Sequence, residues 1–127
     1  MKRSLKIVAL VSLLALLSGH ASAQPQNDQW FVGFWQMTAD EDGTPSDTME
    51  FRTDGTYVNH GYKCGASTAK YHLHGRDIYV TVEVEGKGPI AIIFRPSSDK
   101  KKLIYTSPRT RKNATYERLQ NNPYRSS

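Results

Sequence analysis

Apolar and polar residues alternate along most of the chain that follows Trp30. The clearest case runs from Ile78 to Glu85, where isoleucine and valine side chains alternate with tyrosine, threonine and glutamate. A strand places such alternate residues on one face, whereas a helix would spread the valines around its whole circumference. The pattern therefore predicts a half-buried β-strand.

Other short segments show the same alternation or are rich in β-branched and aromatic residues, and turn-forming residues separate them. At most one short helical turn is expected, near Asp28–Val32. The predicted strands are Phe34–Met37, Thr48–Thr53, Thr56–Cys64, Ala69–His74, Ile78–Glu85, Pro89–Phe94, Leu103–Thr106 and Ala114–Leu119. Closing the first strand on the last removes both unpaired edges of such a row. We therefore expect an all-β fold, a single eight-stranded antiparallel up-and-down barrel.

The region after Thr48 allows a prediction of register. Asp54-Gly55 between two alternating segments predicts a type I′ hairpin turn. On the strand that returns from this turn, the simplest inward set is Val58, His60, Tyr62 and Cys64, with Tyr57, Asn59 and Lys63 facing outward. The same alternation pairs Tyr62 with Tyr71 across the next hairpin.

The N-terminus has the pattern of a secretory signal peptide. Lys2, Arg3 and Lys6 precede an apolar run over residues 7–17, and Ala21-Ser22-Ala23 follows as a cleavage pattern of small residues. This run is too short to span a membrane, and no later stretch comes close, so no membrane span is expected. We expect the mature protein to be periplasmic or secreted.

Four parts of the chain follow from these patterns. Residues 1–23 are the predicted signal peptide, and the polar residues 24–29 form a flexible N-terminal segment. Residues 30–120 form the barrel domain, and residues 121–127 form a disordered C-terminal tail.

Charge argues against a nucleic-acid partner. Three of the 17 basic residues lie in the leader and none of the 12 acidic ones do, so the remaining chain carries a net charge of only +2. Its basic residues gather in two loops, Lys100–Lys102 and Arg109–Lys112. These loops are consecutive connections, so we expect them at opposite ends of the barrel.

Histidine and cysteine residues suggest a metal site only weakly. Cys64 is the one cysteine of the chain; a buried thiol, a reactive thiol and an intermolecular disulfide are all open. The expected register puts His60 and Cys64 inside and His72 and His74 outside, so the four ligands do not converge. A weak surface site at His72 and His74 is the remaining metal candidate, and no cofactor is expected.

No set of residues predicts catalysis. Glu83 and Glu85 share a solvent face without an acid–base partner, and no nucleophile motif is present. We therefore do not expect an enzyme.

Gly33-Phe34-Trp35 is a G-x-W motif on the first predicted strand, and Arg118 lies near the end of the last one. These residues resemble the signature of the lipocalin and calycin superfamily, and the short exported chain looks like small bacterial lipocalin-like proteins. The resemblance implies that Trp35 packs at the closed end of the barrel with the Arg118 guanidinium across it. The chain departs from secreted animal lipocalins in its short length and in lacking the usual disulfide and C-terminal helix.

The leading functional hypothesis is binding of a small apolar ligand inside the barrel. The expected wall residues are Phe51, Tyr57, Tyr62, Val82, Ile92 and Tyr105. The alternative is a periplasmic inhibitor or immunity-type protein that blocks a partner enzyme. It would act through residues 24–29 or through the charged turns at Asp40–Asp42 and Lys100–Lys102. We expect a monomer, or a weak dimer linked through Cys64.

Overall fold

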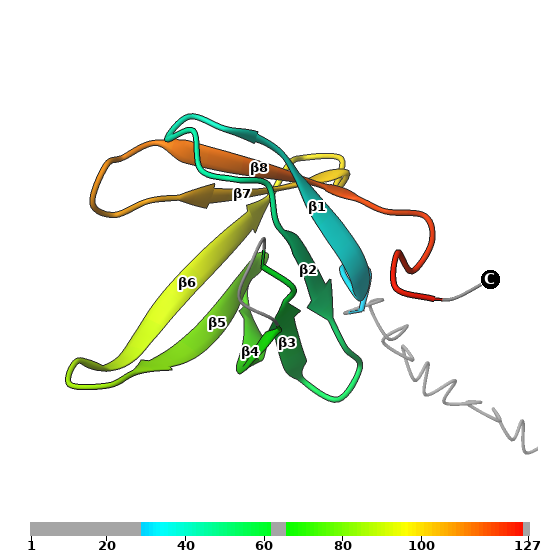
Figure 1. Ribbon diagram of the computed structural model, residues 1–127. Coiled ribbons are helices and arrows are strands. Elements are labelled where there is room, and N and C mark those ends of the chain that lie inside the picture. Colours follow the sequence, from blue (N-terminus) through cyan, green and yellow to red (C-terminus); the bar gives the residue numbers. More distant parts are fainter. Residues whose placement is uncertain (1–28, 62–65, 126–127) are drawn as a thin grey trace, which may run out of the picture.

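The computed structural model describes residues 29–61 and 66–125, and these residues form a closed all-β barrel (Figure 1). The eight strands are β1 (Gly33–Asp40), β2 (Thr48–Phe51), β3 (Thr56–Asn59), β4 (Ser67–His74), β5 (Asp77–Val84), β6 (Gly88–Pro96), β7 (Lys102–Thr106) and β8 (Asn113–Arg118). Each strand is antiparallel to the next one in the chain, and β8 pairs with β1. All the strands that the alternation predicts are present, although their ends differ by up to several residues.

The pairing of β1 with β8 closes the barrel. Trp35 is the direct partner of Arg118 in this ladder, and Met37 is the partner of Tyr116. Gly33 has a φ of 126°, and a Cβ atom there would lie 3.4 Å from Nη1 of Arg118. The G-x-W motif therefore needs its glycine for a positive φ and for the close approach of the arginine. The meeting of the first and last strands, which the sequence predicted, is confirmed.

Consecutive antiparallel strands place their connections alternately at the two ends of the barrel. The connections that follow β2, β4 and β6 lie at the end that holds Trp35, which we call the Trp35 end. The connections that follow β1, β3, β5 and β7 lie at the other end. We call it the flared end because the β5–β6 and β7–β8 hairpins diverge there (Figure 1). The basic loops at Lys100–Lys102 and Arg109–Lys112 consequently lie at opposite ends, as predicted.

The hairpin between β2 and β3 differs from the prediction by one residue. Gly55 N–H donates to Arg52 O, and Arg52 N–H donates to Thr56 O, so the loop is longer than a two-residue type I′ turn. Only Gly55 has positive φ there, at 86°. The resulting register pairs Phe51 with Tyr57.

That register corrects the predicted inward face of β3. Tyr57 and Asn59 lie on the inner face with Phe51, whereas Val58 lies on the outer face opposite Glu50. A one-residue shift moves every side chain of a strand to the other face, which explains why the predicted faces of Tyr57, Val58 and Asn59 are reversed.

The β3–β4 ladder also differs from the prediction. β3 ends at Asn59, and Tyr57 pairs with Ala69. Tyr71 instead lies beside the β2–β3 turn, where its N–H donates to Gly55 O at 3.0 Å. The predicted pairing of Tyr62 with Tyr71 was therefore wrong, because Tyr71 lies beside the β2–β3 turn. Tyr62 itself lies outside the described residues.

Aromatic side chains fill the interior near the Trp35 end. The ring of Phe51 packs edge-on against Phe31 at 5.4 Å, against Tyr71 at 5.4 Å and against Phe94 at 5.9 Å. Val58 on the outer face is also fully buried, and the largest fully buried side chains of the interior are Phe31, Trp35, Met49, Phe51, Ile78, Val80 and Leu103. Close packing of this kind supplies most of the hydrophobic free energy of a domain that has no internal disulfide.

Several predictions concern residues that the structure leaves undescribed. They are the signal peptide at 1–23, the segment up to Asp28, and Tyr62, Lys63 and Cys64. Within the part of the chain that is described, no helix is long and apolar enough to cross a membrane. The predicted turn near the N-terminus corresponds to the hydrogen bond from Val32 N–H to Gln29 O, at 3.0 Å.

Candidate functional site

The wall of the barrel splits between β6 and β7. β5 pairs with β6 all the way from Gly88 to Phe94, but β7 pairs only with Phe94, Arg95 and Pro96. β6 has nine residues and β7 has five, so the first part of β6 extends past the end of β7. On the Gly88 side of Phe94 the β5–β6 hairpin separates from the β7–β8 hairpin, and this separation opens the flared end (Figure 1).

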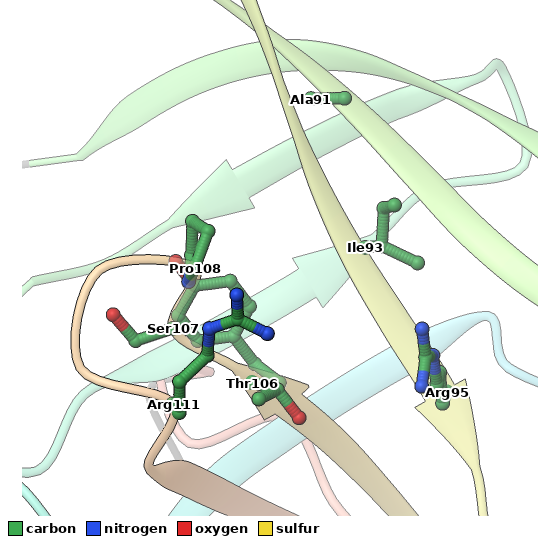
Figure 2. Close-up of a pocket in the computed structure, with 8 residues that line it drawn as sticks. Ala91, Ile93, Arg95, Thr106, Ser107, Pro108 and Arg111 are labelled. Carbon is green, nitrogen blue, oxygen red and sulfur yellow. The ribbon is translucent and has the colours of Figure 1, made fainter.

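A cleft of about 340 Å³ lies in this split. It is lined by Ala91, Ile93, Arg95, Tyr105, Thr106, Ser107, Pro108 and Arg111. Figure 2 shows the residues of β6 on one side and the loop after β7 on the other, with the Arg111 side chain directed from the loop toward the split. The volume lies at the lower end of the range for small-molecule sites, about 300–1,000 Å³.

Inward-facing apolar side chains of β5 and β6 are only partly covered at the flared end. Val82, Ile92 and Tyr105 are half-buried and pack against the edge of the core. Ile90, the partner of Val82 on the same inner face, is 41% exposed. The exposed fraction therefore increases along the inner face from the filled end toward the flared end, and this gradient leaves apolar surface that a ligand could cover.

A group of polar side chains lies on the inner face of β2 and β3 and the loop before them. Asn59 Nδ2 donates to Asp47 Oδ2 at 2.7 Å and to the Tyr57 hydroxyl at 3.2 Å. Asp47 Oδ1 is buried and has no hydrogen-bond partner within the described residues. Burial, with a further contribution from the negative charge of Asp47, raises the pKa of Tyr57 to about 12 and also raises the pKa of Tyr116. Both hydroxyls therefore remain protonated and neutral at physiological pH.

The predicted wall residues divide into two groups. Val82, Ile92 and Tyr105 lie together toward the flared end, and Tyr105 also lines the cleft. Phe51 and Tyr57 belong to the filled interior, where their exposed fractions are 1% and 5%. A ligand at the flared end would thus contact the first group and leave the second in place. Tyr62 lies outside the described residues.

Sequence reasoning did not identify the cleft residues Arg95 and Pro108 as part of a site. Arg111 was noted only as a member of a basic loop, without a location beside β6. A useful signal was present in Pro89, because proline within a strand indicates an edge position where an N–H is not needed.

The histidines do not converge. His60, predicted to face inward, lies on the outer face, where Nε2 is 3.2 Å from Glu50 Oε2 and the ring stacks on Tyr124 at 4.3 Å. His72 and His74 are exposed, and each ring lies beside Tyr79, at 5.5 Å and 5.4 Å respectively. Among the described residues, no three His, Cys, Asp or Glu side chains are grouped so as to hold a metal ion.

The acidic turn after β1 is bound to its own neighbours. The Asp40 carboxylate accepts hydrogen bonds from Thr44 and from Asp42 N–H, and these bonds lower its pKa. Asp42 accepts a hydrogen bond from Thr110 Oγ1 at 2.7 Å. The Asp40–Asp42 turn is therefore linked to the β7–β8 loop.

The basic loop between β6 and β7, at the Trp35 end, contacts an aromatic ring. Lys100 Nζ lies 5.3 Å from the ring centre of Trp30, so this lysine covers an aromatic ring at the Trp35 end.

Comparison of the chain with protein-family models, curated proteins and solved structures finds no significant match. The structure establishes an eight-stranded antiparallel closed barrel, and this architecture is consistent with a calycin-like fold.

Proposed function

We propose that this protein is an exported lipocalin-like binding protein that holds a small apolar ligand at the flared end of the barrel. The ligand would lie against Val82, Ile92 and Tyr105 and would enter through the split between β6 and β7. The observation that carries the proposal is the partial exposure of inward-facing apolar side chains at this end. Elsewhere the interior is filled by packed aromatic rings.

A neutral ligand matches the chemistry of this surface. The inner faces of β5 and β6 contribute aliphatic side chains, while Tyr105 adds an aromatic ring at the mouth of the split. Covering apolar surface is favourable by about 25 cal/mol for each Å², and a ligand that covers Val82, Ile92 and Tyr105 would gain this energy without opening the aromatic core. The proposal therefore requires no rearrangement of Phe51 or Tyr57.

Export is the second part of the proposal, and the N-terminal pattern supports it. If the signal peptide is removed after Ala23, the mature protein isolated from a secreting host begins at Gln24. N-terminal sequencing of that protein tests this directly. A chain that retains Met1 and remains in the cytoplasm would contradict it.

The binding proposal is tested with the neutral fluorescent probe N-phenyl-1-naphthylamine. We expect the protein to bind this probe with micromolar affinity, and Ile92→Glu to weaken binding at least about tenfold because a carboxylate loses its hydration when apolar surface covers it. Ile92→Ala, which removes contact area without adding charge, should weaken it about threefold or more.

His72→Glu is the matched control, since it adds the same charge on the exposed outer face of β4. It should leave probe binding unchanged. Native mass spectrometry of protein purified from the host envelope should also show a bound small molecule. Absence of probe binding, or equal loss in Ile92→Glu and His72→Glu, would contradict the proposal.

A further inference from the structure

One edge of β6 is unpaired from Gly88 to Ile93, because β7 begins to pair only at Phe94. Ser97 N–H donates to Lys102 O at 2.9 Å, so Ser97 is a hydrogen-bonded position on the side of β6 that faces β7. Such positions recur at every second residue of an antiparallel strand. Arg95, Ile93 and Ala91 therefore direct their main-chain groups to this same side of β6, where Arg95 pairs with Ile104 of β7 and Ala91 faces the split.

Pro89 occupies the next position in this series. Its nitrogen carries no hydrogen, and a proline within a strand is tolerated where no partner needs that donor. Pro89 is therefore compatible with an unpaired edge of β6 at this position. The pairing of Phe94 with Tyr105 uses the Ile93 carbonyl, so Ala91 offers both a donor and an acceptor to an added strand and Ile93 offers its N–H.

Side chains around this edge carry positive charge. Arg95 and Arg111 both line the cleft, and the lining contains no carboxylate. Neither arginine forms an ion pair within residues 29–61 and 66–125. The nearby Asp42 carboxylate is already bound to Thr110 and lies 3.9 Å from Lys112 Nζ. The site thus combines free main-chain groups with unpaired guanidinium groups, and these favour a carboxylate-bearing partner.

Pairing with a second copy of this chain is less favourable. An antiparallel pair of β6 edges centred on Ala91 would put Arg95 opposite Lys87 of the second copy, and like charges directly opposite each other destabilise a sheet. A segment with acidic side chains would meet Arg95 and Arg111 with the opposite charge.

We propose that the free edge of β6 binds an extended acidic segment of a protein partner, which adds as a strand in the split between β6 and the β7–β8 loop. Main-chain hydrogen bonds to Ala91 and Ile93 would hold the segment, and carboxylates would pair with Arg95 and Arg111. This inference goes beyond the small-ligand proposal, because it depends on the main chain of β6 and on its outer face rather than on the inner apolar side chains.

The first experiment uses a capped hexapeptide in which valine and glutamate alternate, added at up to millimolar concentration to the isotopically labelled full-length protein. We expect the amide protons of Ala91 and Ile93 to exchange with solvent at least about tenfold more slowly in the complex. The matched peptide with lysine in place of glutamate should bind at least about tenfold more weakly, because it repels both arginines.

Variants of the edge test the two parts of the site separately. Ala91→Pro removes the donor that faces the split, while its other neighbour β5 does not use that group, so it should abolish peptide binding and leave the barrel folded. Ala91→Ser keeps the donor and is the matched control. Arg111→Glu should reduce affinity for the acidic peptide at least about tenfold, whereas Lys101→Glu, at the Trp35 end, should leave it unchanged.

Three outcomes would overturn the proposal. They are no binding of the acidic peptide at millimolar concentration, equal binding of the lysine peptide, and unchanged binding in Ala91→Pro. Protection of Ala91 and Ile93 that rises with protein concentration in the absence of peptide would instead assign the edge to a second copy. Binding of N-phenyl-1-naphthylamine by the same samples reports separately on the small-ligand proposal, so either proposal can fail alone.

Discussion

The guanidinium carbon of Arg118 lies 4.8 Å from the ring centre of Trp35, and the two residues are direct partners in the β1–β8 ladder. Arg118 also donates to Val32 O at 2.9 Å and to Trp30 O. One arginine therefore covers the buried indole and binds the carbonyl groups of the segment that enters β1. These contacts join the two ends of the barrel domain at the Trp35 end.

We expect Arg118→Ala to lower the free energy of unfolding by about 2–3 kcal/mol, because a cation–π contact and charge-assisted hydrogen bonds are lost together. Arg118→Lys should recover less than half of this loss, since an ammonium group cannot reach two carbonyls in the same fork. Urea unfolding measures both variants, with Arg109→Ala at the flared end as the exposed control. Equal stability of Arg118→Ala and Arg109→Ala would contradict the role of this contact.

Gly33 allows that arrangement through its conformation. Gly33→Ala should destabilise the protein by about 1 kcal/mol or more, since an L side chain is strained at a φ of 126° and its Cβ would press on Arg118. Gly43→Ala, at a φ of 70° with no atom near the added Cβ, separates the backbone strain from the contact. If thermal unfolding shows the same loss for both variants, neither the contact with Arg118 nor the larger φ at Gly33 adds to the cost of a Cβ atom at positive φ.

Closure of the barrel could be predicted because it depends on patterns that short stretches of sequence show. The alternation from Ile78 to Val84 has strong contrast between its two faces, and the strand forms as expected. The positions of Trp35 and Arg118 on the first and last strands indicated which ends meet. These signals concern burial and strand order, which short stretches of sequence specify well.

The register of β3 could not be read in the same way. Tyr57 and Val58 are both apolar and both buried, so the alternation has no contrast at this point. The phase of the strand then depends on the turn, and one extra residue around Gly55 reverses both faces. The cleft was also hidden, because it arises from the different lengths of β6 and β7 and not from any local pattern.

Phe51 and Ile90 should respond very differently to truncation, although both face inward. Phe51→Ala removes a ring that packs among several other aromatic rings, and a loss of about 3–5 kcal/mol is expected. Ile90→Ala removes a side chain that is 41% exposed, so the loss should stay below about 1 kcal/mol. Similar losses for the two variants in urea unfolding would show that the flared end is packed as tightly as the rest, which would also weaken the ligand proposal.

Tyr57 makes stability depend on alkaline pH. Burial raises the pKa of its hydroxyl to about 12, whereas the unfolded chain ionises near the ordinary value of 10. The contribution of the protonated hydroxyl is therefore complete below pH 10 and is lost as the pH rises toward 12, by at most about 1.4 kcal/mol for each pH unit. Tyr57→Phe cannot ionise at this position, so its stability should fall less steeply than that of the wild type between about pH 10 and about pH 12.

Urea unfolding across this pH range measures how steeply the stability of each protein falls. The other buried tyrosines, including Tyr116, are common to both proteins. Parallel slopes would show that Tyr57 ionises in the folded protein as easily as in the unfolded chain.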